Sequence, residues 1–191
     1  MSCLLDSNKV IGECLETAFG LKKYCYIIDA VSKDGFQATE GFQKTFNGYY
    51  KLQKRSAEWY QQYYKLFESQ KTEALSFDAL LIKMYECDGK IEVSFVSKLI
   101  ASVDTSMPIW DQYVLKNLGL KKEWDKYNSK DYEKRISKAQ NIYSKIKESY
   151  GTIISSTEGK ECINRFHNEL PNYRELISET KIIDFILWSK R

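Results

Sequence analysis

The side chains most often used in catalysis and metal binding are sparse in this chain of 191 residues. His167 is the only histidine, which excludes metal sites built on several histidines and catalysis by paired histidines. A lone histidine near a helix end is most simply a surface or capping group. The cysteines are widely separated and form no CxxC pair, which favours reduced thiols over disulfides, zinc or iron–sulfur binding. They are Cys3, Cys14, Cys25, Cys87 and Cys162. We therefore expect no metal and no cofactor.

Motifs that bind nucleotides or activate a serine are also missing. The sequence contains no GxxxxGK[ST], GxGxxG or GxSxG. Kinase, dehydrogenase and esterase functions are therefore excluded.

Basic residues are concentrated in one stretch, although the whole chain carries a net charge of only +3. Between Lys116 and Lys147, ten basic side chains stand against four acidic ones. Such an excess could follow a phosphate backbone, with contacts from Lys116, Lys121, Lys122 and Lys126. The other interpretation is an ordinary solvated helix face, because lysine is common on helix surfaces.

The apolar residues that must position these groups recur at helical spacing throughout. The pattern predicts helices at residues 11–18 and 42–50 and an aromatic stripe at 59–67. Ser76 is the expected N-cap of the helix that follows, and Gly89 marks the next turn. A weak strand signal at 91–95 is outweighed by apolar residues that continue at helical spacing.

The second half of the chain continues the helical pattern. A helix over 93–103 should stop in the loop before Pro108, because proline disfavours helix in the preceding residue. Asp111 should open a helix that ends at Gly119. A long apolar stripe over 132–150 and shorter ones around 162–166 and 178–188 complete the pattern.

Composition favours one folded domain over residues 1–191, since 43% of the chain is hydrophobic and 14% aromatic. Both prolines fall between helical patterns, so no linker divides the chain. No apolar run approaches the roughly 20 residues that span a bilayer, and the N-terminus shows no signal sequence. We therefore expect no membrane contact and a cytoplasmic location.

The stretch from Glu86 to Leu120 reads as helix, tight turn, helix with Lys98, proline-containing loop and Asp111. This order resembles the active-site core of the helix-hairpin-helix DNA glycosylases. It is most similar to uncharacterised bacterial proteins with an oxoguanine-DNA-glycosylase-like fold, on residues 94–99 and 108–111. Residues 181–188 resemble the closing helix of that group.

The resemblance implies an all-α, single-domain orthogonal helical bundle, with a glycosylase-like core at about residues 76–120 and a closing helix at about 178–190. It also implies DNA repair chemistry on damaged or modified bases. Lys98, its pKa lowered by partial burial, would attack the sugar of a flipped-out nucleotide and form a Schiff base. Asp111 would assist departure of the base, and Trp110 would pack beside it.

Each of these residues also has a purely structural interpretation. Asp111 can be a helix N-cap, Lys98 lies off the apolar face as surface lysines do, and Trp110 can anchor the core. Asp184, within an apolar helix, can pair with a lysine of a neighbouring helix or face water. The aromatic stripe at 59–67 can form core or stack bases.

Three functions therefore remain open. The first is a DNA glycosylase or lyase, and the second is a non-catalytic nucleic-acid-binding module on the same fold. The third is a helical protein-interaction domain, for which the sequence indicates no particular partner.

Overall fold

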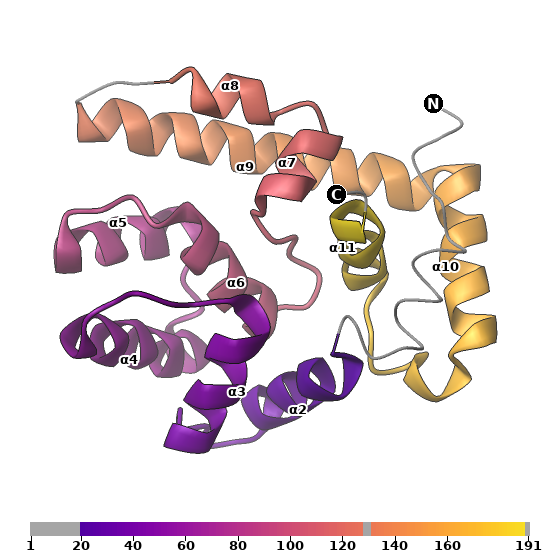
Figure 1. The fold of residues 1–191 in the computed structure, drawn as a ribbon, viewed down its shortest axis with the longest axis horizontal. Coiled ribbons are helices and arrows are strands. Elements are labelled where there is room, and N and C mark those ends of the chain that lie inside the picture. Colours follow the sequence, from indigo (N-terminus) through magenta and orange to yellow (C-terminus); the bar gives the residue numbers. More distant parts are fainter. Residues whose placement is uncertain (1–19, 128–130, 190–191) are drawn as a thin grey trace.

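Every regular element that the computed structural model describes, in residues 20–127 and 131–189, is helical (Figure 1). Ten α-helices and one short 3-10 helix occur in these two ranges. The predicted all-α class is confirmed, and residues 91–95 form no strand. The predicted helix at residues 11–18 lies outside the described part of the chain.

The first half of the described chain contains five helices. They are α2 (Leu21–Ser32), α3 (Glu40–Tyr50), α4 (Ala57–Glu73), α5 (Phe77–Asp88) and α6 (Val93–Val103). The second half contains five more and the 3-10 helix. They are α7 (Gln112–Asn117), α8 (Lys121–Asp125), α9 (Tyr132–Ser155), α10 (Thr157–Glu169), η1 (Pro171–Tyr173) and α11 (Glu179–Ser189).

Side-chain caps set the starts of several helices. The side-chain oxygens of Thr39, Ser56 and Ser76 accept hydrogen bonds from the first turns of α3, α4 and α5. The predicted cap at Ser76 is therefore confirmed. Gly89 ends α5 with φ of 69°, a left-handed conformation that glycine adopts without steric cost. The α5–α6 turn, residues 89–92, follows directly.

Aromatic side chains fill the core of the first half. Phe46 lies 5.2 Å from Phe67 and 6.2 Å from Tyr63 between ring centroids, and Trp59 stacks on Tyr63 at 5.0 Å. Phe67 is fully buried. The stripe at residues 59–67 is thus core, as one of the two interpretations predicted, and offers no exposed stacking platform.

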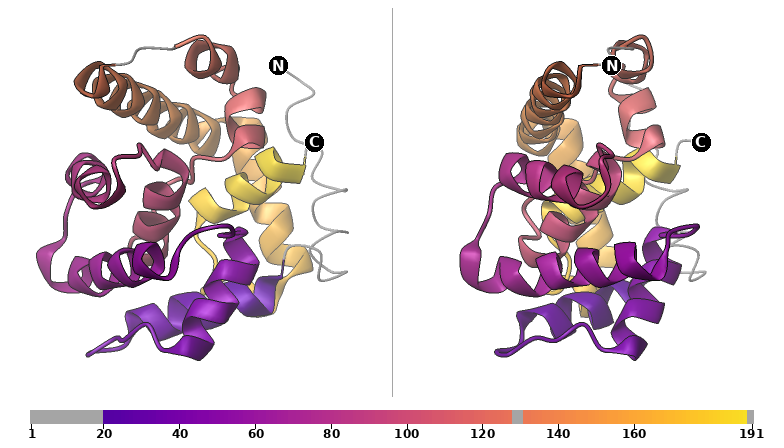
Figure 2. Two further views of the ribbon diagram at one scale, coloured as in Figure 1. Left: turned by 60° about the vertical axis from the view of Figure 1, so that its left-hand side comes forward. Right: turned by 90° about the vertical axis from the view of Figure 1, so that its left-hand side faces the viewer.

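Helix α11 lies between the two halves (Figures 1 and 2). It packs against α7, α9 and α10, and its Phe185 contacts Tyr24 of α2 at 6.3 Å between ring centroids. Helix α6 is likewise surrounded by other helices, because it packs against α2, α4 and α5. Because neighbours surround α6 and α11, polar side chains on either helix become buried.

Among the described residues, no helix combines the length and apolar character that crossing a membrane requires.

Candidate functional site

Lys98 lies in the middle of α6 and is only 8% exposed. Its sequence position is off the apolar face of α6, which is why an exposed lysine was one of the two interpretations. The structure excludes that interpretation, because the helices around α6 cover this side as well. Lys98 is therefore a buried lysine.

The Lys98 ammonium group sits at the C-terminal end of another helix. Its Nζ donates a hydrogen bond to the carbonyl oxygen of Tyr50, the last residue of α3, at 3.2 Å. It also lies 5.5 Å from the ring centroid of Phe95. Helix C-termini carry unpaired carbonyls and partial negative charge, so Lys98 stabilises the end of α3.

Burial lowers the pKa of Lys98, the carboxylate of Asp111 opposes the shift and the positive charge of Lys181 adds to it, so that the pKa is about 8. Burial is the largest of these effects. An amine with this pKa is substantially unprotonated near pH 8, and the unprotonated amine is the nucleophilic form. The environment of Lys98 thus favours amine chemistry.

Asp111 is the N-cap of α7, as predicted. Its Oδ1 accepts a hydrogen bond from the backbone N–H of Tyr113 at 2.8 Å. Its charge acts on Lys98, but no ion pair or hydrogen bond joins these two described residues. The structure therefore brings Asp111 into the electrostatic neighbourhood of Lys98 without direct contact.

Trp110 lies in the core at 3% exposure. Its backbone N–H donates to Ser97 Oγ at 2.8 Å, and its ring meets that of Trp124 edge-on with centroids 5.1 Å apart. These contacts fix the loop before α7 against α6, where Lys98 lies. Trp110 therefore positions the segment that carries Asp111.

A buried polar cluster, which sequence reasoning identified only in part, adjoins Lys98. Asp184 of α11 is 2% exposed, accepts a hydrogen bond from the Tyr150 hydroxyl at 2.5 Å and lies 3.5 Å from Lys181 Nζ. Burial raises the pKa of Asp184, and Lys181 partly offsets this. The lysine that Asp184 pairs with is on its own helix, so both predicted alternatives, a lysine of a neighbouring helix and exposure to water, are wrong. The only sequence signal was a Lys and an Asp three residues apart in an apolar helix.

Four aromatic rings surround the ammonium group of Lys181. The distances from Nζ to the ring centroids lie between 5.0 and 5.7 Å. The rings belong to Tyr24, Tyr49, Tyr50 and Phe185. Cation–π attraction of this kind compensates part of the cost of burying the charge. Tyr50 therefore contacts both buried lysines, Lys98 through its carbonyl and Lys181 through its ring.

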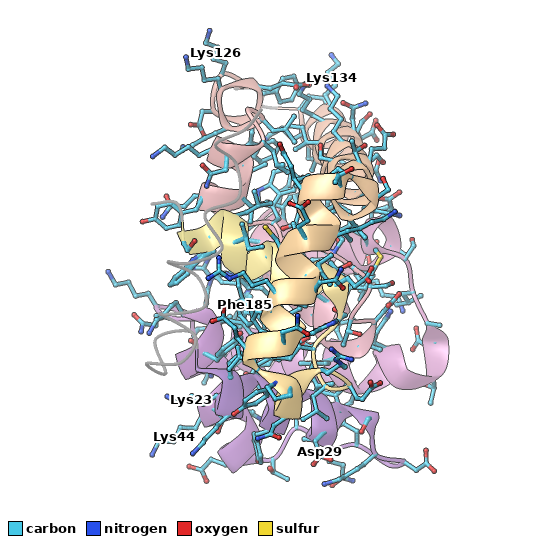
Figure 3. All side chains as sticks on the ribbon, turned by 90° about the vertical axis from the view of Figure 1, so that its right-hand side faces the viewer. Lys23, Asp29, Lys44, Lys126, Lys134 and Phe185 are labelled. Atoms are coloured by element: carbon cyan, nitrogen blue, oxygen red, sulfur yellow. The ribbon has the colours of Figure 1, made fainter. Side chains whose placement is uncertain are left out.

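The lysines predicted to bind nucleic acid lie on α7, on α8 and just after α8. Lys116, Lys122 and Lys126 are exposed, whereas Lys121 is half-buried and pairs with Asp125 at 2.5 Å. Lys126 and Lys134 project from the same end of the molecule (Figure 3). Glu123 pairs with Lys138 and Lys145, so part of the local positive excess is neutralised.

Neither Lys98 nor Asp111 lines any of three pockets found on the described surface. One lies beside the α5–α6 turn, one is lined by Phe77, Ile100 and Tyr143, and one is lined by Cys25 and His167. Access to Lys98 from these pockets would therefore need a rearrangement of the side chains that cover it.

Among the described residues, no three His, Cys, Asp or Glu side chains are grouped as a metal site requires. No family model, curated protein or solved structure matches this chain.

Proposed function

We propose that the protein is a DNA glycosylase or lyase of the helix-hairpin-helix type that acts on damaged or modified bases. The proposal rests on the environment of Lys98, a buried amine whose pKa is lowered to about 8 and on which the charge of Asp111 acts. The order of elements around these residues also agrees with the resemblance. Helix α5, a turn and helix α6 precede a loop that places Asp111 at the start of α7.

The proposed reaction begins with the unprotonated Lys98 amine. Its lone pair attacks the anomeric carbon of the deoxyribose, and the electron pair of the N-glycosidic bond leaves with the base, which takes up the proton released by the amine. The nitrogen then forms a C=N bond as the bond from the anomeric carbon to the ring oxygen breaks. That oxygen takes a proton from water to become a hydroxyl, which leaves a protonated Schiff base. The carboxylate of Asp111 stabilises positive charge on the sugar during departure of the base.

Trapping with borohydride tests this reaction, because hydride reduces a Schiff base to a stable amine. The purified protein is incubated with duplex and single-stranded DNA carrying oxoguanine or an abasic site. We expect a covalent adduct that maps to Lys98 and is lost in Lys98→Met, because methionine has no amine. Methionine is chosen because its side chain suits a buried position. Lys160→Met, the same change at an exposed lysine on α10, should retain the adduct.

Two results would contradict the proposal. One is the absence of any adduct or base release with these substrates. The other is an adduct of undiminished yield in Lys98→Met, provided that the variant is shown to be folded by circular dichroism. In that case another amine is responsible.

A second candidate is a non-catalytic nucleic-acid-binding module. It is favoured by the enclosure of the Lys98 ammonium group between the Tyr50 carbonyl and the Phe95 ring, which gives Lys98 a structural task. This function predicts retention on DNA that weakens steeply with salt, without an adduct. Retention that does not change with salt would contradict it.

A further inference from the structure

A pocket of about 380 Å³, which Lys98 does not line, lies beside the α5–α6 turn. Three cationic residues from three separate segments line it: Arg55 before α4, Lys90 in the turn and Arg135 in α9. Glu92 is the acidic residue that lines the pocket. Cationic side chains converge here from distant parts of the sequence, which a solvated helix face does not produce.

Arg55 already neutralises Glu92. Its Nη2 lies 2.7 Å from Glu92 Oε1, and both side chains are largely buried, at 25% and 12% exposure. The guanidinium group is also held 5.0 Å from the ring centroid of Phe95. Lys90 and Arg135 therefore remain as an excess of positive charge. The carboxylate of Asp88 lies close by, since its Oδ1 accepts a hydrogen bond from the Lys90 backbone N–H at 2.9 Å. Its negative charge reduces the excess to one positive charge.

Two of the arginines that line this pocket each have one guanidinium N–H without a hydrogen-bond acceptor. The Nε atoms of Arg55 and Arg135 are both buried from solvent and make no hydrogen bond. Buried N–H groups without an acceptor are costly, and a rotation of either arginine toward the pocket would let an external acceptor satisfy its Nε. Arginine matches the oxygens of phosphate particularly well, because its planar fork presents several N–H groups.

An aromatic wall flanks the cationic residues. Tyr85 of α5 and Tyr132 of α9 both line the pocket and stack in parallel, with centroids 4.8 Å and planes 7° apart. Tyr132 is 45% exposed, so part of its ring is open to a ligand. Gly89 also lines the pocket, and no atom lies within 4 Å of where its side chain would be. The pocket therefore combines hydrogen-bond donors for an anion, an accessible aromatic face and an uncrowded backbone.

We propose that this pocket binds a phosphate group carried by a nucleotide or a nucleic-acid strand. Arg135 and Lys90 contact the phosphate oxygens, Arg55 lines the pocket while paired with Glu92, and Tyr132 lies against the sugar or base. This binding needs neither Lys98 nor Asp111, so it stands or fails independently of the proposed glycosylase chemistry.

Isothermal titration calorimetry at one fixed, low salt concentration tests the proposal. The ligands are inorganic phosphate, a deoxynucleoside 5′-monophosphate and one single-stranded oligonucleotide with either a 5′-phosphate or a 5′-hydroxyl. The variants are Arg135→Gln and Lys90→Gln. Lys134→Gln is the matched control, because it removes one positive charge from the same helix at a side chain that is 71% exposed and does not line the pocket.

We expect Arg135→Gln to weaken binding of the phosphate ligands about ten-fold or more, the loss typical of a charge-assisted hydrogen bond, and Lys134→Gln to change it less than about two-fold. Preference for the 5′-phosphate strand would assign the pocket to a phosphate monoester, and equal affinity for both strands to a backbone phosphodiester. The proposal is overturned if the folded wild-type protein binds none of these ligands, or if Arg135→Gln and Lys134→Gln weaken binding equally. Borohydride trapping remains a separate readout for Lys98.

Discussion

The protonation of Lys98 is linked to folding, because burial lowers its pKa to about 8 while an unfolded lysine titrates near 10.4. Below pH 8 the amine is charged in both states, and the folded protein bears the full cost of burying the charge. Between pH 8 and about 10.4 the unfolded state binds more protons, so stability from this residue rises with pH. Protonation of Lys98 therefore opposes folding most at neutral pH and below.

Replacing Lys98 with methionine should abolish this pH dependence. We expect the unfolding free energy of the wild type, measured relative to Lys98→Met, to rise by up to about 3 kcal/mol between pH 7 and pH 10. Denaturant unfolding of both proteins at pH 7, 8, 9 and 10 measures the difference. A difference that stays constant over this range would mean that Lys98 keeps an ordinary pKa in the folded protein.

At the scale of single elements, Asp111 has two separable tasks. Its carboxylate caps α7, and its charge acts on Lys98. Asparagine is as good an N-cap as aspartate but carries no charge, whereas alanine provides neither. We expect Asp111→Ala to lower the unfolding free energy by about 1 kcal/mol and Asp111→Asn to change it little. Both substitutions should reduce release of base in the DNA assay.

Ser76 provides the matched control for the cap of α7. Its Oγ accepts a hydrogen bond from the Ala79 N–H at the start of α5. Ser76→Ala should therefore cost a similar free energy of unfolding and leave base release unchanged. If Ser76→Ala reduces base release as much as Asp111→Asn does, the loss reflects stability rather than the charge of Asp111.

The helices themselves were largely predictable, because caps and periodicity are local signals. Ser76 and Asp111 begin helices as their residue types predict, and the stripe at 59–67 is core. The helix α2 was not predicted, although its buried residues Leu21, Tyr24, Ile27 and Val31 have helical spacing.

The burial of Lys98 could not be decided from the pattern of α6 alone. A hydrophobic stripe identifies one buried face, but α2, α4 and α5 together surround the helix. The ring cage of Lys181 and the pocket beside the α5–α6 turn likewise combine residues from separate segments. Such long-range groupings arise only when the chain has folded.

At the scale of the whole molecule, α11 connects the two halves through its buried charges. Asp184 accepts a hydrogen bond from the Tyr150 hydroxyl, and the backbone N–H of Ile109, two residues before Asp111, acts on its carboxylate to lower its pKa. Lys181 lies among the rings of Tyr24 and Tyr50, and the Tyr50 carbonyl accepts from Lys98. The closing helix therefore contacts the segments on both sides of the candidate site.

Removing one partner of this buried pair should cost far more than removing an exposed charge. We expect Lys181→Met to lower the unfolding free energy by about 3 kcal/mol, since it leaves the Asp184 carboxylate buried and unpaired. Adding Asp184→Asn should recover more than half of the loss, because the amide keeps an acceptor for Tyr150 without a charge. Lys33→Met, which breaks the exposed pair with Asp29, should cost less than about 1 kcal/mol. Urea unfolding of the three variants measures these differences. If the double variant is no more stable than Lys181→Met, the lysine contributes through packing in its ring cage rather than by compensating the charge of Asp184.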